Sequence, residues 1–275
     1  MNNEKKYYDL HLHSGFSHDS EASAEDEILA GIEAGLTGMC FTEHNDFDYR
    51  EPDGSEAFSL DLEGYINALS ELKGKYVDRL DILTGLEQGL TIPATERIEA
   101  YDPEGRLDFI IGSTHVVDSL DPYYPEFWED HDAASGVRRY YENMYDCVNV
   151  IDNFDVYGHL DYITRYIPER YAGVSHEKLT PFDLVQEILK KLIYKGKGIE
   201  INTAGWRKGN DPNPAAFILK EYKRLGGEVI TVGSDAHKEE HIGHGIKKAH
   251  ALLGECGFRY ACLFRNRKAE FYSLL

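Results

Sequence analysis

Six of the 12 histidines in this 275-residue chain fall at the ends of short apolar or β-branched runs. In one run His11 and His13 are two residues apart, so on a β-strand both imidazoles point to the same side and can bind one cation. A single histidine in this setting is more often a packed or solvated residue than a ligand. Six together favour a metal site; they are His11, His13, His44, His115, His159 and His237.

Two carboxylates accompany these histidines. Glu87 ends an apolar run, where it can bridge two metals, and Asp235 stands two residues before His237. Imidazole and carboxylate ligands without thiolate suit zinc, manganese or iron rather than a structural zinc knot. A site with several such ions can hold a bridging hydroxide and clamp the oxygens of a phosphoryl group. We therefore expect two to three divalent transition metals (Zn, Mn or Fe).

The elements that must position these residues alternate between strand and helix. Repeated β–α units without a linker favour one parallel-sheet α/β domain over residues 1–275, either open or closed into a barrel. The strand-end histidines favour a barrel, because a parallel barrel gathers the carboxyl ends of its strands on one face. The expected strands are 7–13, 37–42, 81–87, 107–113, 155–159, 198–202 and 228–233, with a closing strand at 259–263. The expected helices are 24–35, 62–76, 135–151, 181–195, 213–225 and 243–256.

Local signals predict some helix boundaries and faces. Thr180 followed by Pro181 is a good N-cap and N1 pair for a helix start. Gly226 and Gly227 predict the end of the helix before them. The helix over 24–35 presents its apolar positions for burial, which are Ile28, Leu29, Ile32 and Leu36.

Composition excludes several classes of function. Lys and Arg number 29 against 49 Asp and Glu, and the net charge of −20 disfavours binding to nucleic acid or anionic lipid. No stretch approaches the roughly 18 apolar residues of a membrane span, and no apolar run follows the first residues as in a secretory signal. Four cysteines without a CxxC pair are expected to be buried, reduced thiols. We expect a soluble, cytoplasmic protein of unknown oligomeric state.

Several segments, taken in chain order, resemble the motifs of the polymerase and histidinol phosphatase (PHP) superfamily. They are Asp9-Leu10-His11-Leu12-His13-Ser14, Thr42-Glu43-His44, Glu87, Ser113-Thr114-His115, Gly158-His159 and Ser234-Asp235-Ala236-His237. The chain is most similar to the stand-alone histidinol-phosphate phosphatases of that superfamily, in length and in three further segments. These are Phe41-Thr42-Glu43-His44, Gly158-His159-Leu160-Asp161-Tyr162 and Glu200-Ile201-Asn202-Thr203.

The resemblance implies a distorted (β/α)7 TIM-like barrel with a trinuclear metal centre. By motif, the first metal would take His11, His13, Glu87 and Asp235, the second Glu87, His115 and His159, and the third His44, His237 and one residue from the loop after His13. The family places an Asp or His in that loop. His18 and Asp19 both stand at suitable positions, and we favour Asp19 because the local sequence aligns best with relatives that have Asp there.

Arg165 and Arg207 follow strands of the same barrel face, and a guanidinium can bind two phosphate oxygens. We expect Arg165 to bind substrate and to act in catalysis, and Arg207 to bind substrate, with Lys208 as a competitor. Asp161 is predicted to be a catalytic acid for the leaving alkoxide or a partner of His159. A helix-capping role for Asp161 stays open.

Two long connections, residues 46–61 and 116–145, are rich in acidic and aromatic side chains. Long loops in compact domains are often lids or binding loops. Acids and aromatic rings suit a leaving group with an ammonium and an imidazole. A purely solvated acidic loop is the alternative reading.

The leading hypothesis is a metal-dependent phosphomonoesterase that hydrolyses L-histidinol phosphate, a step of histidine biosynthesis, through a metal-bridging hydroxide. The partner is then a small phosphorylated metabolite. One alternative keeps the metals and cleaves phosphodiesters, as exonuclease-like relatives do, although the acidic chain lacks a basic patch. The other alternative is a non-catalytic metal-binding domain.

Overall fold

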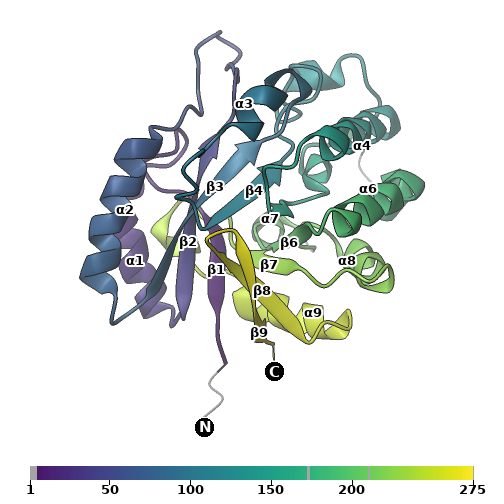
Figure 1. Ribbon diagram of the computed structural model, residues 1–275. Coiled ribbons are helices and arrows are strands. Elements are labelled where there is room, and N and C mark those ends of the chain that lie inside the picture. The colour runs from purple at the N-terminus through teal and green to yellow at the C-terminus, as the bar shows by residue number, and fades with distance from the viewer. Residues whose placement is uncertain (1–4, 172–173, 210, 275) are drawn as a thin grey trace.

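Seven parallel strands form one sheet in the computed structural model, which describes residues 5–171, 174–209 and 211–274 (Figure 1). Each strand pairs with the next in the chain, so the spatial order is the sequence order β1 to β7. All seven predicted strands are present. They are β1 (Tyr8–Leu12), β2 (Gly38–Asn45), β3 (Asp81–Gly89), β4 (Phe109–Ser113), β5 (Val156–Tyr157), β6 (Gly198–Asn202) and β7 (Ile230–Gly233).

The sheet curls until its first and last strands meet. The backbone N–H of His13 donates to Ala236 O at 2.8 Å, and that of Asp235 donates to His11 O at 2.7 Å. Gly233 permits this approach, because a Cβ there would lie 2.3 Å from the Cβ of His11. The α/β fold is thus a nearly closed, distorted (β/α)7 barrel, as predicted.

Helices surround the sheet, with α1 and α2 on one side in Figure 1 and α4, α6 and α8 on the other. The α-helices are α1 (Ala24–Glu33), α2 (Leu62–Tyr76), α3 (Thr95–Glu99), α4 (Ala133–Val150), α5 (His176–Leu179), α6 (Phe182–Tyr194), α7 (Gly205–Lys208), α8 (Ala216–Arg224) and α9 (Ile246–Glu255). Short 3-10 segments are η1 (Ile92–Ala94), η2 (Pro125–Trp128), η3 (Tyr162–Arg165), η4 (Glu169–Tyr171) and η5 (Glu239–His241).

One predicted helix start is wrong by one residue, because α6 begins at Phe182 and not at Pro181. Thr180 does not cap α6, because its N–H and its hydroxyl both donate to His176 O at 3.0 Å and so belong to the preceding turn. Pro181 then occupies the N-cap of α6, without a side-chain cap. The predicted end of α8 is confirmed, since Gly226 follows it with a φ of 94°.

Two expectations from composition can be checked directly. All four cysteines are buried and free of disulfides. Within the described ranges, none of the helices has the length and apolar character that a bilayer crossing requires.

The expected closing strand is one arm of a hairpin that sequence reasoning missed. β8 (Tyr260–Arg265) pairs antiparallel with β9 (Lys268–Ser273). The hairpin covers the amino ends of the barrel strands: Arg265 Nη2 binds Asp81 Oδ2 at 2.7 Å and Arg267 Nε binds Asp155 Oδ2 at 2.6 Å. This end of the barrel is closed by protein, which leaves the opposite, histidine-bearing end as the open face.

The inward face of α1 differs from the predicted one. Leu29 is 41% exposed, whereas Glu27 is buried beside Ile28. Neither carboxyl oxygen of Glu27 has a hydrogen-bond partner among the described residues. Burial, with Glu43 and Asp9 nearby, raises the pKa of Glu27 to about 9, so this side chain is neutral at pH 7.

Because Glu27 is buried, we predict that the stability of the folded protein depends on pH. Between its ordinary pKa near 4.5 and about 9, the folded chain holds a proton on Glu27 that the unfolded chain releases, so Glu27 lowers stability progressively as pH rises. Glu27→Gln keeps the shape and removes the titration. We expect its gain in Tm over the parent to be larger at about pH 8 than at about pH 5, by a few degrees. Glu33→Gln, at an exposed position of α1, is the control, and equal gains at both pH values would contradict a neutral Glu27.

Candidate metal centre

The predicted metal-binding residues meet at the carboxyl end of the barrel strands. His44 and Glu87 lie on β2 and β3 and are direct partners in the parallel register, while His115 and His159 each follow a strand by two residues. Among the described residues, four groups of three side chains bring possible ligand atoms within 4.8 Å of one another. These groups are His13, His44 and His237; His11, Glu87 and His159; His11, His13 and Asp235; and His44, Asp46 and His115.

Four buried side chains bring nitrogen and oxygen atoms to spacings that suit a cation. The Nε2 atoms of His11 and His13 are 3.1 Å apart, and lie 3.2 and 3.4 Å from Glu87 Oε2. The same two nitrogens lie 3.8 and 3.6 Å from Asp235 Oδ1. Ligands held about 2.0 Å from a tetrahedral zinc are about 3.3 Å apart, so these atoms fit such an ion.

Glu87 lies between two groups of histidines. Its Oε1 is 2.8 Å from His159 Nε2 and 3.3 Å from His115 Nε2, while its Oε2 faces His11 and His13. Burial alone would raise the pKa of Glu87, but the surrounding imidazoles hold it well below its usual value. Oε2 is buried and lacks a hydrogen-bond donor within the described part of the chain. An ionised, buried oxygen of this kind is suited to a cation.

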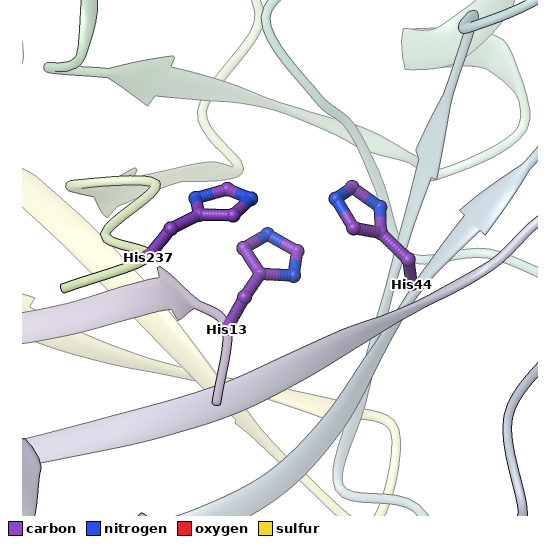
Figure 2. A group of neighbouring side chains, drawn as sticks. All are labelled: His13, His44 and His237. Atoms are coloured by element: carbon purple, nitrogen blue, oxygen red, sulfur yellow. The ribbon is translucent and has the colours of Figure 1, made fainter. Parts of the chain in front are cut away.

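Three imidazoles from separate segments of the chain form a third group, shown in Figure 2. The ring of His13 stacks 4.1 Å from that of His44 and 4.3 Å from that of His237. Asp19 Oδ2 lies 3.0 Å from His237 Nε2 and 3.7 Å from His44 Nε2. His18 is exposed beside Phe58, so the structure brings Asp19 rather than His18 to these histidines.

Sequence reasoning missed the carboxylates that orient the imidazoles. Glu200 on β6 accepts from His11 Nδ1 at 2.6 Å, and Asp46 accepts from His115 Nδ1 at 2.8 Å. Such bonds fix the ring so that Nε2 is free to bind a metal, and they raise its basicity. The available signals were a glutamate inside an apolar strand and an aspartate two residues after a strand-end histidine.

Asp235 is held in a conformation that costs energy. Its φ of 55° is in the left-handed region, which a non-glycine residue rarely occupies. The turn directs its Oδ1 to His11 and His13 and its Oδ2 toward Asn202 and Arg165. Strain of this kind is typical of functional sites, where surrounding contacts hold a side chain in place.

A cavity of about 410 Å³ opens onto these groups, and both predicted arginines line it. Arg207 donates to the carbonyl oxygens of Ser234 and Asp235 at 2.7 and 3.0 Å. Arg165 lies over the ring of Tyr162, 4.8 Å from its centre. The side chain of Lys208, the alternative to Arg207, lies outside the described residues.

Asp161 is placed differently from either predicted role. Its side chain is fully buried and does not line the cavity. One carboxylate oxygen accepts from Asn213 Nδ2 at 2.5 Å and the other from Ala215 N at 2.8 Å. Its side chain does not bind His159. Asp161 occupies the N-cap position of the helical turn that begins at Tyr162, but its carboxylate makes no capping bond there. The acid role predicted for Asp161 is not supported by this position, because both oxygens are engaged away from the cavity.

The two long loops contribute a rim to the cavity. Six residues of these loops form the rim. They are Tyr49, Glu51 and Phe58 from the first loop and Asp121, Tyr123 and Tyr124 from the second. The hydroxyl of Tyr49 donates to Asp121 at 2.7 Å and that of Tyr124 to Glu51 at 2.5 Å, so the rim joins both loops. Other members of the second loop turn away: Phe127 and Trp128 are buried, and Glu126, Glu129 and Asp130 are exposed.

Known proteins are similar to this chain along nearly its whole length. The sequence is 33% identical to the histidinol-phosphatase of Lactococcus lactis, over 96% of this chain and 97% of that protein. It is 31% identical to a probable histidinol-phosphatase of Thermotoga maritima, over 92% and 93% of the two chains.

A solved structure agrees with these sequence matches. The crystal structure of the Lactococcus lactis histidinol phosphate phosphatase, complexed with zinc, L-histidinol and phosphate, superposes with a TM-score of 0.87 at 31% identity. It covers 96% of this chain and 99% of its own. The model of the PHP domain matches residues 9–204. With these matches and the seven-stranded barrel, the chain belongs to the PHP domain family.

Proposed function

We propose that this protein is a metal-dependent phosphomonoesterase that hydrolyses L-histidinol phosphate to L-histidinol and phosphate. The observation that carries the proposal is one cavity in which buried imidazoles and carboxylates adjoin two arginines. The Lactococcus lactis relative supports the choice of substrate, because its structure holds zinc, L-histidinol and phosphate.

The ligand groups support two to three metal positions. His11, His13, Glu87 and Asp235 would hold one ion, and Glu87 with His115 and His159 a second. His44, His237 and Asp19 would hold a third. Zinc is the expected metal because the relative contains it, and the same imidazole and carboxylate set also suits manganese or iron.

Bound divalent metals would supply a water whose pKa is lowered to about 7 and would offset the charge on phosphate oxygens. The chain's own part is then to position the ester. Arg165 and Arg207 lie in the same cavity, and a guanidinium fork matches two phosphate oxygens. These cations matter because the chain as a whole carries a charge of −20.

The rim fits the leaving group. L-histidinol carries an ammonium and an imidazole, and the rim offers the carboxylates of Glu51 and Asp121 with the rings of Tyr123 and Phe58. Burial and the neighbouring Asp121 raise the pKa of Tyr49, so its hydroxyl stays protonated and keeps its bond to Asp121. The same acidic rim opposes a nucleic-acid strand, which argues against the phosphodiesterase alternative.

A substrate panel tests the function. With zinc or manganese added, we expect turnover of L-histidinol phosphate to exceed that of glycerol phosphate and phosphoserine by about a hundredfold in kcat/KM, because the rim binds only the first leaving group well. Labelled oligonucleotides should stay intact. Preferred cleavage of oligonucleotides would favour the phosphodiesterase, and bound metal without turnover of any ester the non-catalytic alternative.

Substitution of the shared carboxylate tests the metal assignment. Glu87→Gln removes a charge that faces both His11 and His159, so we expect loss of at least about one metal equivalent and of activity by about a hundredfold or more. Elemental analysis and phosphate release measure the two effects. Glu126→Gln, at an exposed loop position, is the matched control. Full metal content with a near-normal rate would show that Glu87 is not a ligand.

The phosphate-binding role of Arg165 has its own test. Arg165→Ala should slow hydrolysis about tenfold or more, roughly 1.4 kcal/mol of transition-state stabilisation. Metal content should not change, because Arg165 is not among the proposed ligands. Arg138→Ala, on the exposed side of α4, serves as the control. A parental rate in Arg165→Ala would remove the residue from the mechanism.

A further inference from the structure

We propose that Asn213 is a positioning residue that holds the guanidinium of Arg165 in its working orientation. Asn213 is buried and does not line the cavity over the metal centre. Its Oδ1 accepts from Arg165 Nε at 2.7 Å, and its Nδ2 donates to Asp161 Oδ1 at 2.5 Å. The proposal rests on the phosphate-binding role proposed above for Arg165.

The chemistry of the two partners fixes which way the amide points. A guanidinium only donates hydrogen bonds, and an ionised carboxylate only accepts them. Asn213 therefore has to turn its oxygen to Arg165 and its nitrogen to Asp161. Asp161 is itself fixed, because its second oxygen accepts from Ala215 N at 2.8 Å. Asp161 therefore contacts Asn213, and Asn213 contacts Arg165. The acid that the sequence predicted to be catalytic thus acts on the proposed phosphate-binding residue through Asn213.

A second amide, that of Asn202 on β6, also binds the guanidinium of Arg165. Asn202 Oδ1 accepts from Arg165 Nη2 at 3.2 Å and from Ala204 N at 3.0 Å. Its Nδ2 lies 3.2 Å from Asp235 Oδ2 and 3.3 Å from Glu200 Oε2, so this amide also has a single allowed orientation. Because Asn202 contacts Asp235, a proposed metal ligand, its substitution would disturb the metals as well. Asn213 is the cleaner position for a test.

Arg165 needs such support because a strong competitor is close. Its Nη1 lies 3.6 Å from the Oδ2 of Asp235. A flexible arginine side chain that paired fully with this carboxylate would turn its fork away from a phosphate ester. The Asn213 bond to Nε, the Asn202 bond to Nη2 and the ring of Tyr162 beneath the guanidinium together oppose that movement. Preorganisation of this kind lowers the cost of aligning the fork in the transition state.

A double-mutant cycle measures the coupling. Asn213→Ala alone should lower kcat about tenfold with unchanged zinc content, because Arg165 is present but misaligned. In the Arg165→Ala background the same change should cost less than about twofold, because nothing remains for Asn213 to position. Parental activity in Asn213→Ala, or losses that multiply in the double variant, would overturn the proposal. A merely structural role of Asn213 would give the multiplied losses.

Asp161→Asn provides a second readout if Asn213→Ala does not fold. The new amide keeps an oxygen toward Ala215 N and then presents its NH2 group to Asn213. Asn213 would have to invert and point its own NH2 group at Arg165, so we expect kcat to fall about tenfold although residue 161 does not line the cavity. A parental rate would overturn the proposal. A parental rate in Arg165→Ala would overturn it too, and would at the same time remove the proposed role of Arg165.

Discussion

The site relies first on the contact between β1 and β7. This contact brings residues 11 and 13 against residue 235, although more than 200 positions separate them in the chain. Backbone bonds between the segments and the absence of a side chain at Gly233 hold the two strands at close range. Without that closure Glu87 would still face histidines of its own side of the barrel, but Asp235 and His237 would not reach them.

Around that contact, buried polar side chains form hydrogen-bonded pairs, and each hydrogen bond fixes the orientation of its partner. Glu200 orients the ring of His11 and Asp46 that of His115, while amides hold Arg165. A buried polar group is costly unless it is bonded, so each of these partners restricts its neighbour to one orientation. The result is a set of imidazole and carboxylate atoms that are held close to one another at the carboxyl end of the barrel.

Acidic and basic groups are distributed unevenly over the cavity. Acidic groups dominate the whole protein and reach the rim, where Glu51 and Asp121 face the cavity. Metals and the two arginines would supply the local positive charge at the base. An ester with an anionic phosphate and a cationic leaving group matches this division, since each end meets the opposite charge.

The strand and helix order and the histidines at the strand ends could be read from the sequence alone, because alternating β–α units and histidines after apolar runs are local patterns. Tertiary contacts determine how those histidines group, that Asp19 and not His18 turns to His237, and that Asp161 lies behind Asn213. They also determine the burial of Glu27 and the hairpin that covers the barrel floor. These features depend on contacts between segments far apart in the chain. The periodicity and spacing of the sequence do not predict which buried side chains will bond to each other. The packing of the closed barrel determines those pairs.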